Sequence, residues 1–169
     1  LVAAQKSLSY NNQLIDMVAY ETNPTNITID KNPEVLNLAY MNGHTEMNIW
    51  YVYPVSPEFC NLFDTENDMR FKLFFNKNHR YNDRGSGTAN WDMLSTKFFY
   101  PTVGMKTGEM YLTLAECKAR LGNLSGAMQT LNILRSKRIK GSGATLATPA
   151  TTEEIVKLII DERRRELAM

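Results

Sequence analysis

The sequence predicts a mostly α-helical fold with irregular loops and a few short strands. From about residue 105 onward, apolar residues recur at helical spacing in three segments that are bounded by turn and capping residues. Residues 22 to 104 sustain no helical period, and they hold five of the six prolines and most of the aromatic residues. Brief extended runs at 27–29, 49–55 and 97–100 indicate the short strands.

Short helices are expected in the first part of the chain. Residues 1 to 21 are predicted to be helical in part. Their apolar stripe consists of Leu14, Ile15, Met17 and Val18. Another helix is expected to begin at Pro57, because proline is favoured at the first helical position. The rest of residues 22 to 104 is predicted to be mainly loop, which is typical of a functional surface that a scaffold holds elsewhere.

Two helices are predicted between residues 106 and 136. The apolar face of the first consists of Met110, Leu114, Cys117 and Leu121. Gly122 is expected to end this helix and Ser125 to cap the second. The apolar face of the second consists of Ala127, Leu131 and Leu134. The turn between them is so short that the helices must be antiparallel, and this αα-hairpin resembles one tetratricopeptide unit.

A third helix is predicted after a Gly/Thr-rich linker, residues 141–145, that is flexible by composition. Thr151 and Glu154 have the spacing of a capping box at its start. Apolar residues from Ile155 onward nearly encircle this helix, so at least half of it must be buried.

Composition and charge exclude several function classes. The 169 residues are 43% hydrophobic and 22% charged, with a formal net charge of +1, so nothing favours nucleic acid or an anionic membrane surface. No apolar run approaches the roughly 20 residues of a membrane span. No motif for a cofactor, a metal or a catalytic nucleophile is present. Cys60 and Cys117 are weak grounds for a disulfide in a chain of this length.

The motifs of the C-terminal third resemble the SusD/RagB family, the outer-membrane nutrient-binding lipoproteins of Bacteroidetes. The family patterns are E-x-Y-L-x-x-A-E-x-x-A-R-x-G, then A-x-x-x-L-N-x-x-R, then E-R-R-x-E-L. The matching positions are Glu109, Tyr111, Leu112, Ala115, Glu116, Ala119, Arg120, Gly122, Ala127, Leu131, Asn132, Arg135, Glu162, Arg163, Arg164, Glu166 and Leu167. A weaker likeness begins near Asn32 and includes Asp68-Met69-Arg70, which is similar to a D-x-R segment of the family.

This resemblance implies a SusD-like fold and a partial SusD/RagB domain over residues 1–169. Residues 1–104 would be a variable, loop-rich, ligand-binding region and residues 105–169 a helical scaffold. The family's N-terminal half and extreme C-terminus would be absent. The resemblance also implies a non-catalytic, surface-exposed protein of the outer membrane, held by a lipid anchor that this chain lacks. Such proteins bind oligosaccharides, or peptides in some members, and deliver them to a SusC-like TonB-dependent transporter.

The charged run Glu162, Arg163, Arg164, Arg165 and Glu166 is interpreted as a structural ion network rather than a catalytic site. Glu162 and Glu166 extend the buried stripe of their helix. A carboxylate there needs a partner, and arginine offers a bidentate one. Asp161 and Arg165 are expected to pair along the helix.

Candidate ligand-binding residues lie in the loop-rich region. A pyranose ring stacks on aromatic side chains, and its hydroxyls need planar polar partners. The residues that meet these requirements are Trp91, Tyr81, Trp50, Tyr51, Asn82 and Arg84. Trp50 lies in an extended apolar run and fits the core of a strand equally well.

Two other function classes remain open. A tetratricopeptide-like protein-interaction scaffold would continue in helical repeats, whereas the middle of this chain is rich in aromatic residues and asparagine. A glycoside hydrolase would need two inward carboxylates about 5–10 Å apart, and no motif in the sequence pairs any two.

Overall fold

The computed structural model describes residues 1–19, 32–37, 57–76, 93–94 and 104–167. The helices in these residues are α1 (Val2–Tyr10), α3 (Pro57–Cys60), α4 (Met69–Phe74), α5 (Thr107–Arg120), α6 (Leu124–Ser136), the 3₁₀-helix η3 (Gly141–Ala144) and α7 (Thr152–Leu167). Two short strands, β1 (Phe75–Asn76) and β2 (Met93–Leu94), pair antiparallel. The expected fold class, mostly α-helical with short strands, is therefore confirmed. The extended runs expected at 27–29, 49–55 and 97–100 lie outside the described residues.

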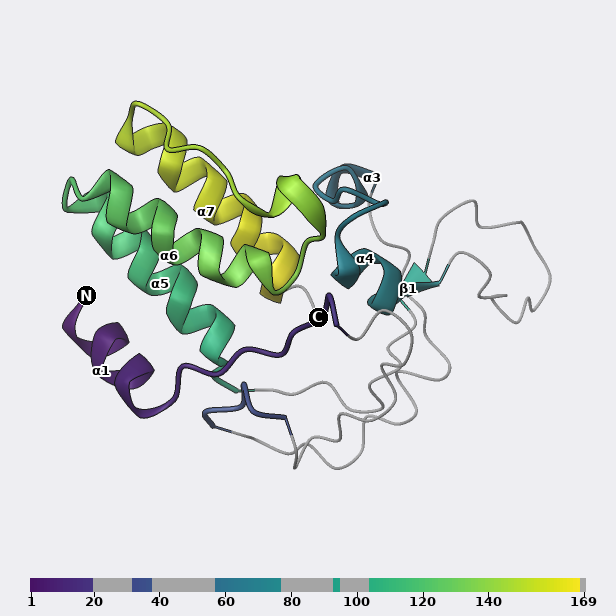
Figure 1. Cartoon of the computed structure of the whole chain (residues 1–169), viewed down its shortest axis with the longest axis horizontal. Coiled ribbons are helices and arrows are strands. Elements are labelled where there is room, and N and C mark those ends of the chain that lie inside the picture. The colour runs from purple at the N-terminus through teal and green to yellow at the C-terminus, as the bar shows by residue number, and fades with distance from the viewer. Residues whose placement is uncertain (20–31, 38–56, 77–92, 95–103, 168–169) are drawn as a thin grey trace.

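Helices α5, α6 and α7 form the main layer of the structure. Figure 1 shows α5 and α6 side by side as an antiparallel hairpin, with α7 along them and α1 against α5. Small residues at the contact between α5 and α6 allow the close approach: Ala115, Ala119 and Ala127 are all fully buried. The predicted αα-hairpin is thus present, and its likeness to a tetratricopeptide unit stays a prediction.

The first hydrophobic core lies between these three helices. It consists of Leu112, Ala115, Ala119, Ala127, Met128, Leu131, Leu134, Ile155 and Ile159. The face predicted for α6 is confirmed. The face predicted for α5 is confirmed at Leu114 alone, since Leu121 is 68% exposed and Met110 and Cys117 are only partly buried. The prediction followed the larger side chains, whereas α5 buries the side that carries alanines, where α6 can approach most closely.

The helix ends follow local chemistry with one correction. Gly122 has a φ of +80°, a left-handed conformation that suits glycine, and it lies just beyond α5. The cap of α6 is Asn123 rather than Ser125, because the Asn123 Oδ1 accepts a hydrogen bond of 2.9 Å from the Gly126 amide. The capping box before α7 is confirmed by reciprocal bonds of 3.2 Å between Thr151 and Glu154.

A second hydrophobic core lies beside the helical layer. It consists of Ile15, Met17, Phe63, Met69 and Phe71. Helix α3 begins at Pro57 as expected. The helical stripe expected at Leu14 to Val18 is wrong, because α1 ends at Tyr10 and residues 11–16 contain no helix. Ile15 and Met17 are buried all the same, since this segment runs along the helical layer and packs against α3 and α4.

Backbone hydrogen bonds join the segments that carry the two cores. The Met69 amide donates to the Arg138 carbonyl at 2.8 Å, and the Met17 amide donates to the Lys137 carbonyl at 2.9 Å. The Thr107 amide at the start of α5 donates to the Glu34 carbonyl at 2.8 Å. The chain just after α6 therefore serves as the common attachment point for two distant segments.

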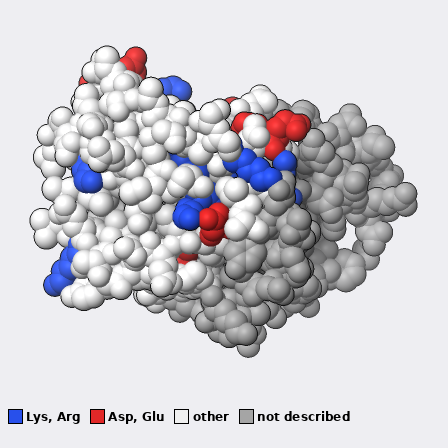
Figure 2. All heavy atoms as spheres, in the orientation of Figure 1, with Lys and Arg blue, Asp and Glu red and all other residues white. Residues whose placement is uncertain are grey.

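On the face seen in Figure 2, the described residues form no large patch of one charge sign. Basic and acidic side chains lie near one another among uncharged ones. Within the described part of the chain, no helix combines the length and the hydrophobicity that crossing a bilayer requires.

Candidate functional site

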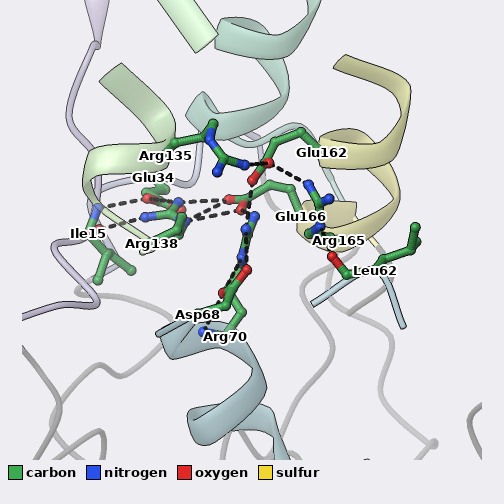
Figure 3. A network of polar contacts seen from close by, with 10 residues as sticks. All are labelled: Ile15, Glu34, Leu62, Asp68, Arg70, Arg135, Arg138, Glu162, Arg165 and Glu166. Atoms are coloured by element: carbon green, nitrogen blue, oxygen red, sulfur yellow. Dashed lines mark hydrogen bonds and ion pairs between the residues drawn. The ribbon is translucent and has the colours of Figure 1, made fainter. Parts of the chain in front are cut away.

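A buried network of arginines and carboxylates lies between the two hydrophobic cores. Its charged members are Glu34, Asp68, Arg70, Arg135, Arg138, Glu162, Arg165 and Glu166. Figure 3 shows these side chains converging from the start of α4, the end of α6 with the residues that follow it, α7 and the segment around Glu34. Four positive and four negative formal charges cancel, which is the arrangement that a low-dielectric interior requires.

Glu162 is the acceptor for three arginines. Its Oε1 accepts from the Arg70 Nη2 at 2.6 Å, and its Oε2 accepts from the Arg135 Nη1 at 2.5 Å and the Arg165 Nη1 at 2.6 Å. Glu162 is fully buried because it lies on the same face of α7 as Ile155 and Ile159, one turn further along.

Glu166 lies one turn beyond Glu162 and accepts from two arginines, one of which, Arg70, it shares with Glu162. The Arg138 Nη2 donates to its Oε1 at 2.7 Å, and the Arg70 Nη1 donates to its Oε2 at 2.9 Å. Arg138 also donates to Glu34 Oε1 at 2.6 Å and to the Ile15 carbonyl at 2.6 Å. Arg138 therefore ties the last turn of α7 to two segments from the first part of the chain.

Asp68 and Arg70 form a clamp at the start of α4. The Asp68 carboxylate accepts from the Arg70 Nε at 2.9 Å and the Nη2 at 2.7 Å, and from the Arg70 amide at 3.0 Å. This fork-to-fork geometry sets the direction of the guanidinium. Arg70 then reaches both buried carboxylates of α7, Glu162 and Glu166, while remaining fully buried.

The linker after α6 is fastened to the same network. Arg135 donates to the Ala144 carbonyl at 3.2 Å and the Gly143 carbonyl at 2.7 Å. Asn132 holds Leu146 through two bonds, one of 2.9 Å to its carbonyl and one of 3.1 Å from its amide. The linker expected to be flexible by composition thus contains a 3₁₀ turn that α6 holds in place.

Burial and neighbouring charges act in opposite directions on the acidic members. Burial alone would raise the pKa of Glu162, but Arg70, Arg135 and Arg165 lower it to about 2. Burial would likewise raise the pKa of Glu166, and the adjacent arginines lower it below its usual value. Burial prevails at Glu34, whose pKa is raised because Arg138 compensates it only in part and Glu166 lies nearby.

The arrangement suits a structural role rather than acid–base catalysis. The buried carboxylates of α7, Glu162 and Glu166, are each held by two or three arginines, and no buried side-chain polar atom among the described residues lacks a hydrogen-bond partner. A general acid at neutral pH needs a raised pKa and access to substrate, whereas Glu162 has a lowered pKa and is fully buried.

The structure divides the charged run of α7 into two groups. Glu162, Arg165 and Glu166 belong to the buried network, whereas Arg163 pairs with Glu116 at 3.3 Å and Arg164 with Glu58 at 3.1 Å. The helical spacing explains this division, because the side chains at 163 and 164 leave the buried face. The structural purpose assigned to the run remains a prediction.

The expected pairing of Asp161 with Arg165 is wrong. Arg165 pairs with Glu162 and donates to the Leu62 carbonyl at 2.6 Å, and Asp161 pairs with Lys157 at 3.2 Å. The buried carboxylate competes for the arginine more strongly than the exposed one, since the interaction is stronger out of water.

The predicted ion network lacked five residues that the structure places in it: Glu34, Asp68, Arg70, Arg135 and Arg138. A signal existed for two of them, because Asp68-Met69-Arg70 matches a family-like segment and two buried glutamates demand cations. Nothing local marks Arg138, which follows the end of α6.

The candidate ligand-binding residues lie outside the described part of the chain. They are Trp91, Tyr81, Trp50, Tyr51, Asn82 and Arg84. Cys60 and Cys117 are not joined in a disulfide. Within the described residues, no group of three or more His, Cys, Asp or Glu side chains is placed to hold a metal ion.

Comparisons with known proteins agree with this architecture. Residues 95–169 match the SusD family. The structure is similar to that of a SusD-like carbohydrate binding protein from Bacteroides vulgatus, with a TM-score of 0.69 and 23% sequence identity. The similarity covers 97% of this chain and 37% of that protein's chain. No curated protein matches the sequence.

Proposed function

We propose that this chain is part of a longer protein of the SusD family that captures nutrient glycans at the cell surface, because residues 95–169 match that family. The family match is the observation that carries the proposal. The carbohydrate-binding relative adds support, because its fold is similar over 97% of this chain, including the part that precedes the family match.

The two parts of the chain have different tasks in this proposal. Residues 105–169 are the helical scaffold, and residues 1–104 are the variable region that contacts ligand. The two hydrophobic cores support the division, since the buried residues of the first all come from α5, α6 and α7, and those of the second all come from residues 15–71. The arginine–carboxylate network joins the two parts.

The protein binds its ligand without transforming it. The buried carboxylates among the described residues are paired with arginines, as expected of a structural scaffold. None of these buried carboxylates is therefore free to act as the acid of a hydrolase. The ligand contacts come from aromatic and planar polar residues of the variable region. In order of preference, these are Trp91, Tyr81 and Trp50, followed by Tyr51, Asn82 and Arg84.

Location and partner follow from the same family. We propose that the full-length protein is lipid-anchored, faces outward from the outer membrane and passes its ligand to a SusC-like TonB-dependent transporter. Co-purification of such a transporter with the tagged protein from its native membrane would support this partnership. Recovery of the protein from the soluble fraction, with no transporter attached, would contradict it.

A binding screen of the full-length protein tests the central proposal. In native affinity gels that contain single polysaccharides, we expect at least one glycan to retard migration, with no release of reducing sugar on prolonged incubation. Release of sugar would contradict the non-catalytic role. Binding to peptides with silence across all glycans would contradict glycan capture and favour a peptide-binding member, and binding only to folded proteins would favour an interaction scaffold.

A further inference from the structure

The buried carboxylates of the network differ in how fully their oxygens are hydrogen-bonded. Asp68, Glu162 and Glu166 each accept from arginine side chains on both oxygens. At Glu34, the hydrogen bonds that the carboxylate receives from described residues all end on Oε1. The other oxygen, Oε2, therefore offers a place for a proton where no arginine has to give up its acceptor.

The cation that faces Glu34 is shared with a second carboxylate. The Arg138 Nη2 donates to Glu34 Oε1 at 2.6 Å and to Glu166 Oε1 at 2.7 Å. Two negative charges thus lie against one nitrogen, in an interior where solvent screens them little. Glu166 has a second arginine, Arg70, whereas Arg138 is the only arginine among the described residues that pairs with Glu34. Of the two carboxylates, Glu34 is the less compensated.

The charges around Glu34 come from several elements. Arg70 of α4 pairs with Glu166 rather than with Glu34. Lys137 and Asp16 pair with each other at 2.7 Å and are 41% and 39% exposed, so solvent screens their effect. The charged groups that surround Glu34 are Arg138 after α6, Glu166 of α7, Arg70 of α4, Lys106 at the start of α5, and the surface pair Lys137 and Asp16.

Backbone bonds hold the segment of Glu34 in place whatever the charge of its side chain. The Thr107 amide donates to the Glu34 carbonyl at 2.8 Å, and the Leu36 amide donates to the Met105 carbonyl at 2.9 Å. Glu34 is only 3% exposed, but the residues on either side of it are partly exposed. A proton can therefore reach the carboxyl group from solvent with little movement of the core.

Burial and the neighbouring charges act in the direction that this geometry predicts. Burial raises the pKa of Glu34, Arg138 offsets the rise only in part, and the charge of Glu166 adds to it. Burial would also raise the pKa of Glu166, but Arg138 and Arg70 lower it below its usual value. A proton that enters this end of the network is therefore held by Glu34.

We propose that Glu34 is the proton-uptake site of the buried network and forms a latch that holds residues 11–17 and 32–37 on the scaffold in its protonated as well as its ionised form. In the protonated form, Oε2 carries the proton and Oε1 still accepts from the Ile15 amide and from Arg138. Arg138 then has only the charge of Glu166 to neutralise, and the repulsion between the two carboxylates is gone.

The latch gives stability a pH dependence of opposite sign to that of Glu162. The folded protein binds the proton of Glu34 more tightly than the unfolded chain does, because the pKa is raised above 4.5 on folding. The contribution of Glu34 to stability therefore increases as the pH falls through the folded pKa toward 4.5. At Glu162, by contrast, the folded pKa is lowered to about 2, and the contribution is lost as the pH falls.

Carboxyl carbon NMR of the full-length protein, labelled at the glutamate Cδ, tests where the proton binds. The signal that disappears in Glu34→Gln belongs to Glu34, and we expect it to titrate in the wild type with a midpoint above pH 4.5. In Glu166→Gln this midpoint should move down, because the repelling charge is gone and Arg138 serves Glu34 alone. A wild-type midpoint at or below 4.5, or a midpoint that rises or stays the same in Glu166→Gln, would overturn the proposal.

Two neutral substitutions in the same network test the stability effect. Glu34→Gln resembles the protonated form, so at pH 7 we expect it to change the unfolding equilibrium constant by less than about tenfold. Glu166→Gln removes a charge that two arginines share and should raise this constant about a hundredfold or more. Between pH 7 and pH 5 the wild type should gain stability relative to Glu34→Gln. Equal losses in the two variants at pH 7, or a wild type that loses stability relative to Glu34→Gln on acidification, would contradict proton uptake at Glu34.

Hydrogen exchange at the Ile15 amide reads the latch itself, since this amide donates to Glu34 Oε1 at 2.7 Å. In Glu34→Gln the side-chain carbonyl oxygen is retained, and exchange at Ile15 should stay within about threefold of the wild type at pH 7. Glu34→Ala is the matched control, because it removes the acceptor, and exchange there should rise about tenfold or more. If Ile15 exchanged as fast in Glu34→Gln as in Glu34→Ala, the neutral side chain would not hold the segment and the latch would be refuted.

Discussion

Gly108 of α5 lies directly against the carboxylate of Glu166 on α7. A Cβ atom at position 108 would stand 2.7 Å from Glu166 Oε1, well inside contact distance. That oxygen cannot move aside cheaply, because Arg138 donates to it at 2.7 Å and Arg70 holds the other oxygen of the same carboxylate. The absence of a side chain at position 108 is therefore what lets α5 approach the buried network.

Substituting this glycine tests the close approach. We expect Gly108→Ala to lower the free energy of unfolding by about 1–2 kcal/mol, the usual cost of overpacking less the gain in helix propensity. Urea denaturation of the purified protein measures the change. Gly143→Ala is the control, because a Cβ there meets only the Ile139 Cγ2 at 3.9 Å, and it should change stability by less than about 0.5 kcal/mol. Equal effects of the two substitutions would contradict the contact.

Removing the charge at the centre of the network should be costly. In Glu162→Gln, three arginines lose the carboxylate that they share, and we expect the free energy of unfolding to fall by about 3–5 kcal/mol. Asp161→Asn is the neighbouring control, since Asp161 pairs only with Lys157 near the surface, and its loss should cost at most about 0.5 kcal/mol. Chemical denaturation of both variants gives the comparison, and a cost at position 162 no larger than at 161 would refute the buried pairing.

How far sequence could predict this network depends on which of its contacts are local. The burial of Glu162 and Glu166 followed from the helical repeat of α7, because both extend the face of Ile155. Their partner Arg70 lies 92 positions before Glu162. The Asp68-Met69-Arg70 segment marks Arg70 as a candidate cation, but a single sequence does not show which distant residues it pairs with. The prediction of the buried face of α5 failed for a related reason. The approach of the neighbouring helix, not the size of the side chains, determines that the alanine side is buried.

The stability that Glu162 contributes should depend on pH. Its pKa falls from the ordinary value of 4.5 to about 2 in the folded protein, so the contribution is complete above about pH 5 and is lost as the pH falls toward 2. We expect the difference in unfolding free energy between wild type and Glu162→Gln to be constant from pH 7 to pH 5 and then to shrink. Denaturation series at each pH measure it. A difference that stayed constant down to pH 3 would mean that the pKa is not lowered by folding.

The fastening of the linker after α6 can be tested by proteolysis. Asn132 makes two hydrogen bonds to Leu146, and we expect Asn132→Ala to cost about 1–3 kcal/mol and to speed tryptic cleavage after Lys140. Gln129→Ala on the exposed side of the same helix removes only a 3.4 Å bond to Ser125 and should leave cleavage unchanged. If both variants were cut at the wild-type rate, Asn132 would not be what holds the linker.

The ligand-binding region can be tested through its two tryptophans. Trp91 is proposed as a platform on which a sugar ring stacks, so we expect Trp91→Ala to weaken glycan binding by about 1 kcal/mol or more, with unfolding stability unchanged. Trp50 lies in an apolar run that equally suits a strand core, and Trp50→Ala is then expected to lower stability by about 3–5 kcal/mol instead. Isothermal titration with the identified glycan, together with thermal unfolding of each variant, separates these effects.

Tyr10→Ala is the control for exposed aromatic residues, since Tyr10 is 78% exposed at the end of α1, and it should change neither glycan affinity nor unfolding stability. Unchanged affinity in a folded Trp91 variant would remove this residue from the site. A loss of affinity at Trp50 without a loss of stability would move the platform there.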